Sequence, residues 1–205
     1  MDDISKERRT VSLRLTLEAD KIQGFFPILQ HGFMVKVQVG CSIKTMLCKQ
    51  FGLSPEYVED RIKTIFLDGK TVDDIDSAVI KDGSTLALSA AMPGLVGAIL
   101  RRGSHLASLR SQIAHREGEN AFSRREGMVV LKLFNLLMDE LGQIFLKEGI
   151  FLRREYLEGF LMSLPEDFWA GCKAVQMDGQ EVGLDHLLKC LDKYDLVMLR
   201  VDCGV

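Results

Sequence analysis

Short stretches in which apolar and polar residues alternate are the clearest pattern in this chain. Apolar side chains occupy every second position from 11 to 17 and again from 35 to 39. A period of two places alternate side chains on opposite faces, so each stretch predicts a strand with one buried face. Apolar runs predict further strands at 62–67, 85–89, 129–134, 172–177 and 196–201.

Two helices are also predicted. Residues 43–51 carry apolar side chains at the spacing of one helix face, and residues 154–164 form the helix expected in the second unit. Ser42 precedes the first helix, where its side chain can accept a bond from an early backbone N–H. Gly52 is a fitting end for the first helix, and Pro165 ends the second because proline cannot continue one.

The two halves of the chain repeat each other. Asp68-Gly69 returns as Asp178-Gly179, an offset of 110 residues, and the match runs without a gap over 55–88 and 165–198. Glycine supplies the positive φ that tight hairpin turns need, so both Asp-Gly pairs predict such turns. The repeat also predicts that residues 62–89 and 172–201 fold alike, as strand, turn and strand.

We therefore expect an α+β fold of two tandem β-grasp-like units, each a small mixed sheet with one covering helix. The expected boundaries are 1–92 for the first unit, 93–126 for an arginine-rich connecting segment and 127–205 for a shorter second unit. Residues 128–147 fit two interpretations: one long helix, or a strand at 129–134 followed by a helix at about 136–147. The repeat favours the second, because residues 129–133 resemble residues 11–15.

The residues around these turns point to a known family. The stretch from Phe66 to Val72, followed by residues 81–88, resembles the end of the small sulfur-carrier proteins of molybdopterin and thiamin synthesis. The resemblance covers about 35–50 residues in each unit and implies their ubiquitin-like β-grasp fold. It does not extend to their working group, a C-terminal Gly-Gly. Gly94 and Gly97 are separated, and Gly204 is followed by Val205.

Composition narrows the function further. A net charge of −3 provides no general attraction to nucleic acid or anionic lipid. The five cysteines are odd in number and lack metal-ligand spacing, so we expect reduced thiols, no metal and no cofactor. No basic start precedes an apolar run, and the longest uncharged stretch is too short to span a bilayer, which favours a cytoplasmic protein without a membrane partner.

Two features carry candidate chemistry. Cys41 precedes a predicted helix start, where the helix dipole would lower the pKa of a thiol and make it reactive; the alternative is a small buried side chain. The connecting segment holds six arginines against two acidic residues from 101 to 125, a local net charge of +4. Arg101, Arg102 and Arg110 are its candidate contacts for an anionic ligand or an acidic protein surface. The alternative is a linker whose arginines pair with the acidic units on either side.

These observations favour a non-catalytic protein-interaction or scaffold protein with an unidentified protein partner. No catalytic residue is expected, since no nucleophile elbow, phosphate-binding loop or dinucleotide fingerprint occurs. The first alternative is an accessory protein or subunit related to sulfur carriers in cofactor biosynthesis. The second is an anion- or RNA-binding module that uses the arginine segment, although the lack of interleaved aromatic residues makes nucleic acid the weaker partner.

Overall fold

The computed structural model describes residues 9–105 and 123–204 as a mixed α+β chain. The chain divides into two compact units. Met1–Ile28 and Gln143–Val205 form one, which we call the terminal unit, and Leu29–Gly142 form the other, which we call the inserted unit. Among the described residues, no helix is both long enough and apolar enough to cross a membrane.

The inserted unit contributes five strands in its described residues. The strands are β2 (Phe33–Val39), β3 (Thr64–Leu67), β4 (Lys70–Thr71), β5 (Thr85–Ser89) and β6 (Arg125–Phe134). Their order is β4-β3-β5-β6-β2, and only the β5–β6 pair is parallel. Alternation along β2 and β6 turns Val35 and Val129 to the buried face, where they stand opposite each other.

Helices α2 (Ile43–Thr45), η2 (Met46–Gln50, a π-helical turn) and α3 (Pro55–Asp60) pack on this sheet, and α4 (Gly94–Leu100) follows β5. The predicted first helix is confirmed, but as α2 continued by η2. Ser42 caps it by accepting a hydrogen bond from the Thr45 backbone N–H at 3.2 Å. Gly52, with a φ of +69°, follows its end.

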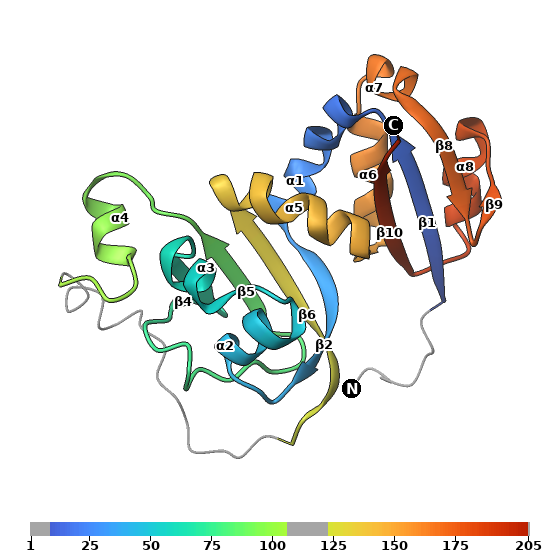
Figure 1. Ribbon diagram of the computed structural model, residues 1–205. Coiled ribbons are helices and arrows are strands. Elements are labelled where there is room, and N and C mark those ends of the chain that lie inside the picture. The colour runs from blue at the N-terminus through green and yellow to red at the C-terminus, as the bar shows by residue number, and fades with distance from the viewer. Residues whose placement is uncertain (1–8, 106–122, 205) are drawn as a thin grey trace. The chain divides into compact units, whose positions relative to one another are not determined.

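The terminal unit has its own set of strands. They are β1 (Thr10–Leu17), β7 (Ile150–Arg153), β8 (Cys172–Met177), β9 (Gln180–Glu181) and β10 (Leu196–Cys203). Their order is β7-β10-β1-β8-β9, with β1 and β10 parallel and the other pairs antiparallel. Figure 1 shows β1 lying between β10 and β8, although these strands come from opposite ends of the chain.

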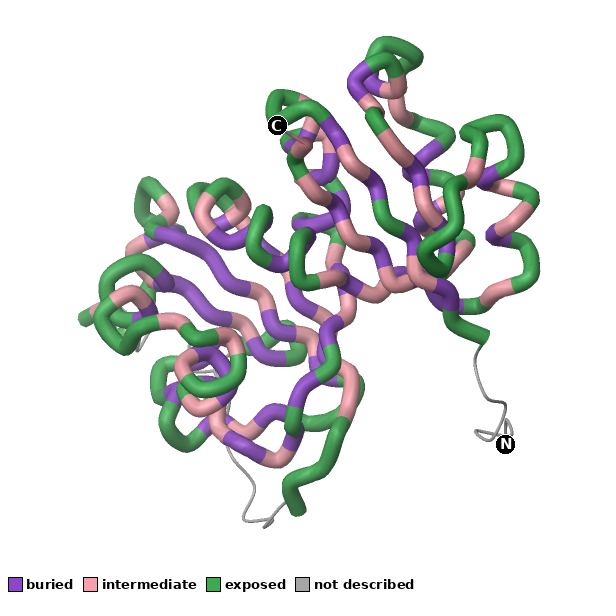
Figure 2. Tube along the Cα trace, turned by 45° about the vertical axis from the view of Figure 1, so that its right-hand side comes forward, coloured by how far each residue is buried: buried purple, intermediate pink, exposed green. Residues whose placement is uncertain are grey.

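Helical segments accompany these strands. They are η1 (Ala19–Phe25, a 3-10 helix), α1 (Phe26–His31), α5 (Leu136–Glu148), α6 (Arg154–Ser163), α7 (Glu166–Ala170) and α8 (Leu184–Leu191). Helices α1 and α5 run across the two boundaries between the units. Figure 2 marks buried residues alternating with half-buried and exposed ones along the strands, which is the period-two pattern that the sequence predicted.

The region with two interpretations is resolved as a strand followed by a helix. Strand β6 ends at Phe134, Asn135 adopts a positive φ of 57°, and α5 starts at Leu136. Asparagine tolerates this left-handed conformation better than most residues, so it can form the corner between the two elements. The single long helix over 128–147 is therefore rejected.

Both predicted Asp-Gly turns are confirmed. Gly69 and Gly179 have φ values of +78° and +81°, and each lies in a two-residue turn that joins a hairpin. The preceding Asp68 and Asp178 also have positive φ, which is the geometry of the turn favoured in tight hairpins.

The similarity of the two copies ends beyond these hairpins. In the inserted unit β3 pairs with β5, whereas in the terminal unit β8 pairs with β1 and is separated from β10. Residues 62–89 and 172–201 therefore do not form the same strand, turn and strand arrangement. The hydrogen bonds of the turn aspartates follow this difference in strand pairing. The Asp68 carboxylate accepts a bond from the Thr85 N–H of β5, whereas the Asp178 carboxylate accepts one from the Ser12 N–H of β1.

The unit boundaries also differ from the expected 1–92 and 127–205. Strand β1 hydrogen-bonds to β10 and β8, so the start of the chain belongs with its end. Strand β6 hydrogen-bonds to β5 and β2, so it completes the sheet formed by the first half. Long-range strand pairing, rather than the order of the repeat in the sequence, thus defines the two units.

Candidate functional site

A corner between α6 and α7 builds one wall of a surface groove in the terminal unit. Leu157, Phe160 and Leu161 are buried and hold α6 against the unit. The helix stops after Ser163 because Leu164, which precedes Pro165, adopts an extended conformation. Leu164 and the nearby Met162 both line the groove.

Helix α8 builds the other wall. Its leucines at 184, 187, 188 and 191 follow the spacing of one broad helix face. Leu187 and Leu191 are buried and fix the helix, whereas Leu184 is 42% exposed and Leu188 is half-buried. The apolar face of α8 is thus wider than the part that packs on the unit, and the remaining apolar side chains line the groove.

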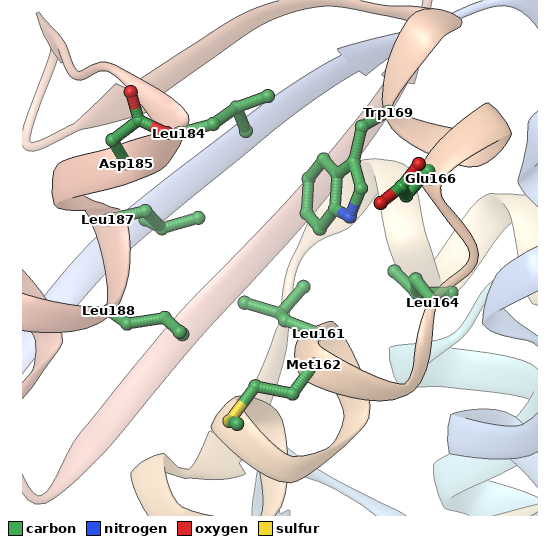
Figure 3. Close-up of a pocket in the computed structure, with 9 residues that line it drawn as sticks. All are labelled: Leu161, Met162, Leu164, Glu166, Trp169, Leu184, Asp185, Leu187 and Leu188. Atoms are coloured by element: carbon green, nitrogen blue, oxygen red, sulfur yellow. The ribbon is translucent and has the colours of Figure 1, made fainter.

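The groove has a volume of about 400 Å³. Figure 3 shows the side chains of α8 on one side and those of α6 and α7 on the other, with the Trp169 ring turned toward the space between them. Its nine lining residues are Leu161, Met162, Leu164, Glu166, Trp169, Leu184, Asp185, Leu187 and Leu188. Seven are apolar, and Met162 is 73% exposed.

Aromatic packing positions the tryptophan, which is the single one in the chain. The Trp169 ring meets the Phe168 ring edge-on, with centroids 5.4 Å apart. Phe168 is buried and lies 5.8 Å from Phe25 of η1, which in turn lies 5.4 Å from Phe160 of α6. This cluster joins η1, α6 and α7, so the groove wall is supported by the core of the unit.

Two carboxylates border the apolar lining. Glu166 lies in the first turn of α7 and Asp185 in the first turn of α8. Figure 3 shows them on opposite sides of the groove. Within the described part of the chain, neither carboxylate has an ion-pair partner, and both residues are exposed. The groove therefore combines an apolar floor with negative charge at two edges.

Two apolar residues of the groove are present in one copy of the repeat and replaced by acidic residues in the other. At the offset of 110 residues, Trp169 corresponds to Glu59 and Leu184 to Asp74. In the inserted unit Glu59 binds Arg102, and the Asp74 carboxylate accepts bonds within its own turn, including one from the Ser77 hydroxyl. The first copy folds without these apolar residues, so the repeat itself does not require them.

The candidate arginines are not gathered into a site by the described structure. Arg102 donates to the Glu59 carboxylate at 2.9 Å and to the Val58 carbonyl at 3.3 Å, and its side chain is only 8% exposed. It therefore attaches the end of α4 to α3. Arg101 is exposed beside it, and Arg110 lies outside the described residues.

The Cys41 side chain is buried in the protein rather than exposed for reaction. The residue is 5% exposed, and its Sγ donates to the Gln38 carbonyl and accepts from the Gln50 side chain. Burial raises the pKa of the Cys41 thiol, which is the opposite of the lowering expected from a helix start. The interpretation as a small buried side chain therefore agrees with the geometry, and the reactive-thiol interpretation does not.

The glycines compared with the carrier tail are also part of the folded structure. Gly94 and Gly97 lie in α4, and a Cβ at Gly97 would stand within contact of the Met92 carbonyl. Gly204 donates its N–H to the Leu17 carbonyl at 2.8 Å, and its carbonyl accepts from Lys173. Neither segment resembles a free flexible end.

Comparison with protein-family models, with curated proteins and with solved structures finds no match to the chain. The groove and the chemistry of its lining are therefore the features that bear on function. One wall of the groove has a pattern in the sequence, because the leucine spacing at 184, 187, 188 and 191 is that of an amphipathic helix. Residues 166–170 gave no such signal, since a helix of five residues is too short to show a period.

Proposed function

We propose that this protein is a non-catalytic interaction protein and that the groove between α6, α7 and α8 holds apolar side chains of a partner polypeptide. The observation that carries the proposal is the gathering of seven apolar side chains, including Trp169, into a groove of about 400 Å³. Exposed contiguous apolar surface is costly in water, and on folded proteins it commonly marks a binding surface.

The lining is suited to the role of a binding hot spot. Tryptophan contributes a large rigid contact area, and methionine adapts its shape to different partners. Met162 and Leu184 remain accessible to a partner because they are 73% and 42% exposed. The volume lies in the range of 300–1,000 Å³ that is typical of ligand-binding sites. A few large side chains of a partner would fill it.

The proposal includes a relationship of the scaffold to ubiquitin-like β-grasp proteins. The support is that both units share one succession of strand directions: antiparallel, parallel, antiparallel, antiparallel. Both also carry an Asp-Gly hairpin at the same place in that succession. In the inserted unit the two central strands are β6, which is next to β2, and β5, which is next to β3. In the terminal unit they are β10, next to β7, and β1, next to β8. Because β1 resembles β6 in sequence, the two central strands of the terminal unit have on this view exchanged places.

The proposed function predicts that a charge placed in the groove abolishes binding without harming the fold. The probe is a synthetic helix with uncharged ends and leucines at positions i, i+3, i+4 and i+7, titrated against the full chain while Trp169 fluorescence is recorded. We expect a saturable blue shift as the helix covers the indole. Met162→Glu should weaken binding by about tenfold or more, because a buried unpaired carboxylate costs over 1.4 kcal/mol.

Leu95→Glu is the matched control. Leu95 is 69% exposed and lies on α4 in the inserted unit, outside the groove lining. This variant should bind the helix as the unmodified protein does. The proposal fails if no saturable change occurs with the unmodified protein, or if both variants lose binding to the same extent.

A further inference from the structure

We infer that the partner segment is an amphipathic α-helix with lysine or arginine on both sides of its apolar face. This inference rests on the proposed function, since it names the partner of the same groove. Its basis is the combination of helical walls, an apolar floor and two carboxylates at opposite edges that have no ion-pair partner among the described residues.

The walls favour a helix over an extended segment. Both are built from helices, α6 and α7 on one side and α8 on the other, whose backbone groups are largely bonded within the helices themselves. An extended segment would lie on these walls with its own N–H and C=O groups unpaired, because none of the nine described lining residues belongs to a strand. A helix satisfies its backbone internally and presents apolar side chains along one face.

The edges favour basic residues. Among the nine lining residues, two are acidic and none is basic. Glu166 and Asp185 lie across the groove from each other, so a helix seated between them would bring one flank close to each carboxylate. Lysine or arginine on each flank would be attracted, and acidic residues there would be repelled. The two carboxylates thus select the charge of the partner.

A second role of these carboxylates is local to their own helices. Both lie in first turns, where negative charge stabilises a helix through its dipole. Asp167 separates this role from partner selection, because it is exposed in the same first turn of α7 but does not line the groove. Asp167→Asn alters the helix terminus of α7 and leaves the groove edge unchanged.

The test compares three versions of one synthetic helix with the same leucine face and with lysine, neutral or glutamate flanks. Each is titrated against the full chain and followed by Trp169 fluorescence at low salt. We expect the lysine version to bind about tenfold more tightly than the glutamate version, since exposed pairs each contribute up to about a few-fold and repulsion adds to the difference. High salt should reduce the ratio.

The double variant Glu166→Gln with Asp185→Asn should bring the ratio close to one, and Asp167→Asn should preserve it. Binding of all three helices with equal affinity would overturn the inference and leave the proposed function standing. A ratio that survives the double variant would also overturn it, because the selection would then come from other charges. Failure of the neutral helix to bind would instead count against the proposed function.

Discussion

A fragment of residues 29–142 should fold cooperatively on its own, whereas a fragment of residues 1–92 should not. The first contains every strand that the structure describes in the inserted unit, including β6. The second lacks Val129, Leu131 and Leu133, which are fully buried. Each such side chain contributes about 1.5–3 kcal/mol, so the loss approaches the total stability of a small domain. Urea unfolding followed by far-UV circular dichroism measures the difference.

Fragment 1–92 is a stringent comparison because it corresponds to the unit expected from the repeat. It retains β1, whose residues 11–15 resemble residues 129–133 of β6, but β1 pairs with β8 and β10 in the full chain. The absence of a cooperative transition in fragment 29–142 would contradict the unit assignment, whatever fragment 1–92 does.

Phe168→Ala should destabilise the terminal unit by about 3–5 kcal/mol, the usual cost of truncating a buried phenylalanine. The ring is buried between Phe25 and Trp169, and a Cβ at Gly24 would come within 2.8 Å of it, so the surroundings are tightly packed. The urea midpoint of the transition reported by Trp169 should fall accordingly.

Met162→Ala provides the comparison within the same groove. Because Met162 is 73% exposed, its truncation should change stability by less than about 0.5 kcal/mol. Equal effects of the two substitutions would show that the aromatic cluster does not support the groove wall.

Local features of the fold could be predicted because short-range rules decide them. The alternation in residues 11–17 and 35–39 predicted β1 and β2, and the Asp-Gly pairs predicted the turns of both hairpins. Ser42 and Pro165 marked helix ends through hydrogen bonding and steric restriction. Each of these signals involves residues that are close in the sequence.

Strand partners could not be predicted in the same way. Strand β1 has the period of a half-buried strand, but that pattern is satisfied equally beside β2, β8 or β10. Parallel pairing of Thr10–Leu17 with Leu196–Cys203 depends on contacts between the two ends of the chain. A repeat in the sequence suggested the simpler arrangement of independent tandem units, and long-range pairing produced a different one.

The candidate site was missed for a related reason. Residues 184–191 lie outside the helices predicted from the sequence, although the spacing of their leucines is helical. The role of Trp169 depends on α7 meeting α8 in space, which no local pattern indicates. The net positive charge of the connecting segment made Arg102 a candidate binding residue, but in the structure Arg102 forms an ion pair within the inserted unit.

Site-specific photo-cross-linking tests the central claim most directly, namely that the groove is the partner-binding surface. A photo-reactive phenylalanine derivative replaces Met162 in the full chain, and a second version carries it at Leu95. We predict a discrete adduct from position 162, mapped to a basic amphipathic helix of the partner and competed by the lysine-flanked synthetic helix, with none from position 95. Equal adducts from both positions, or none from position 162, would contradict the account.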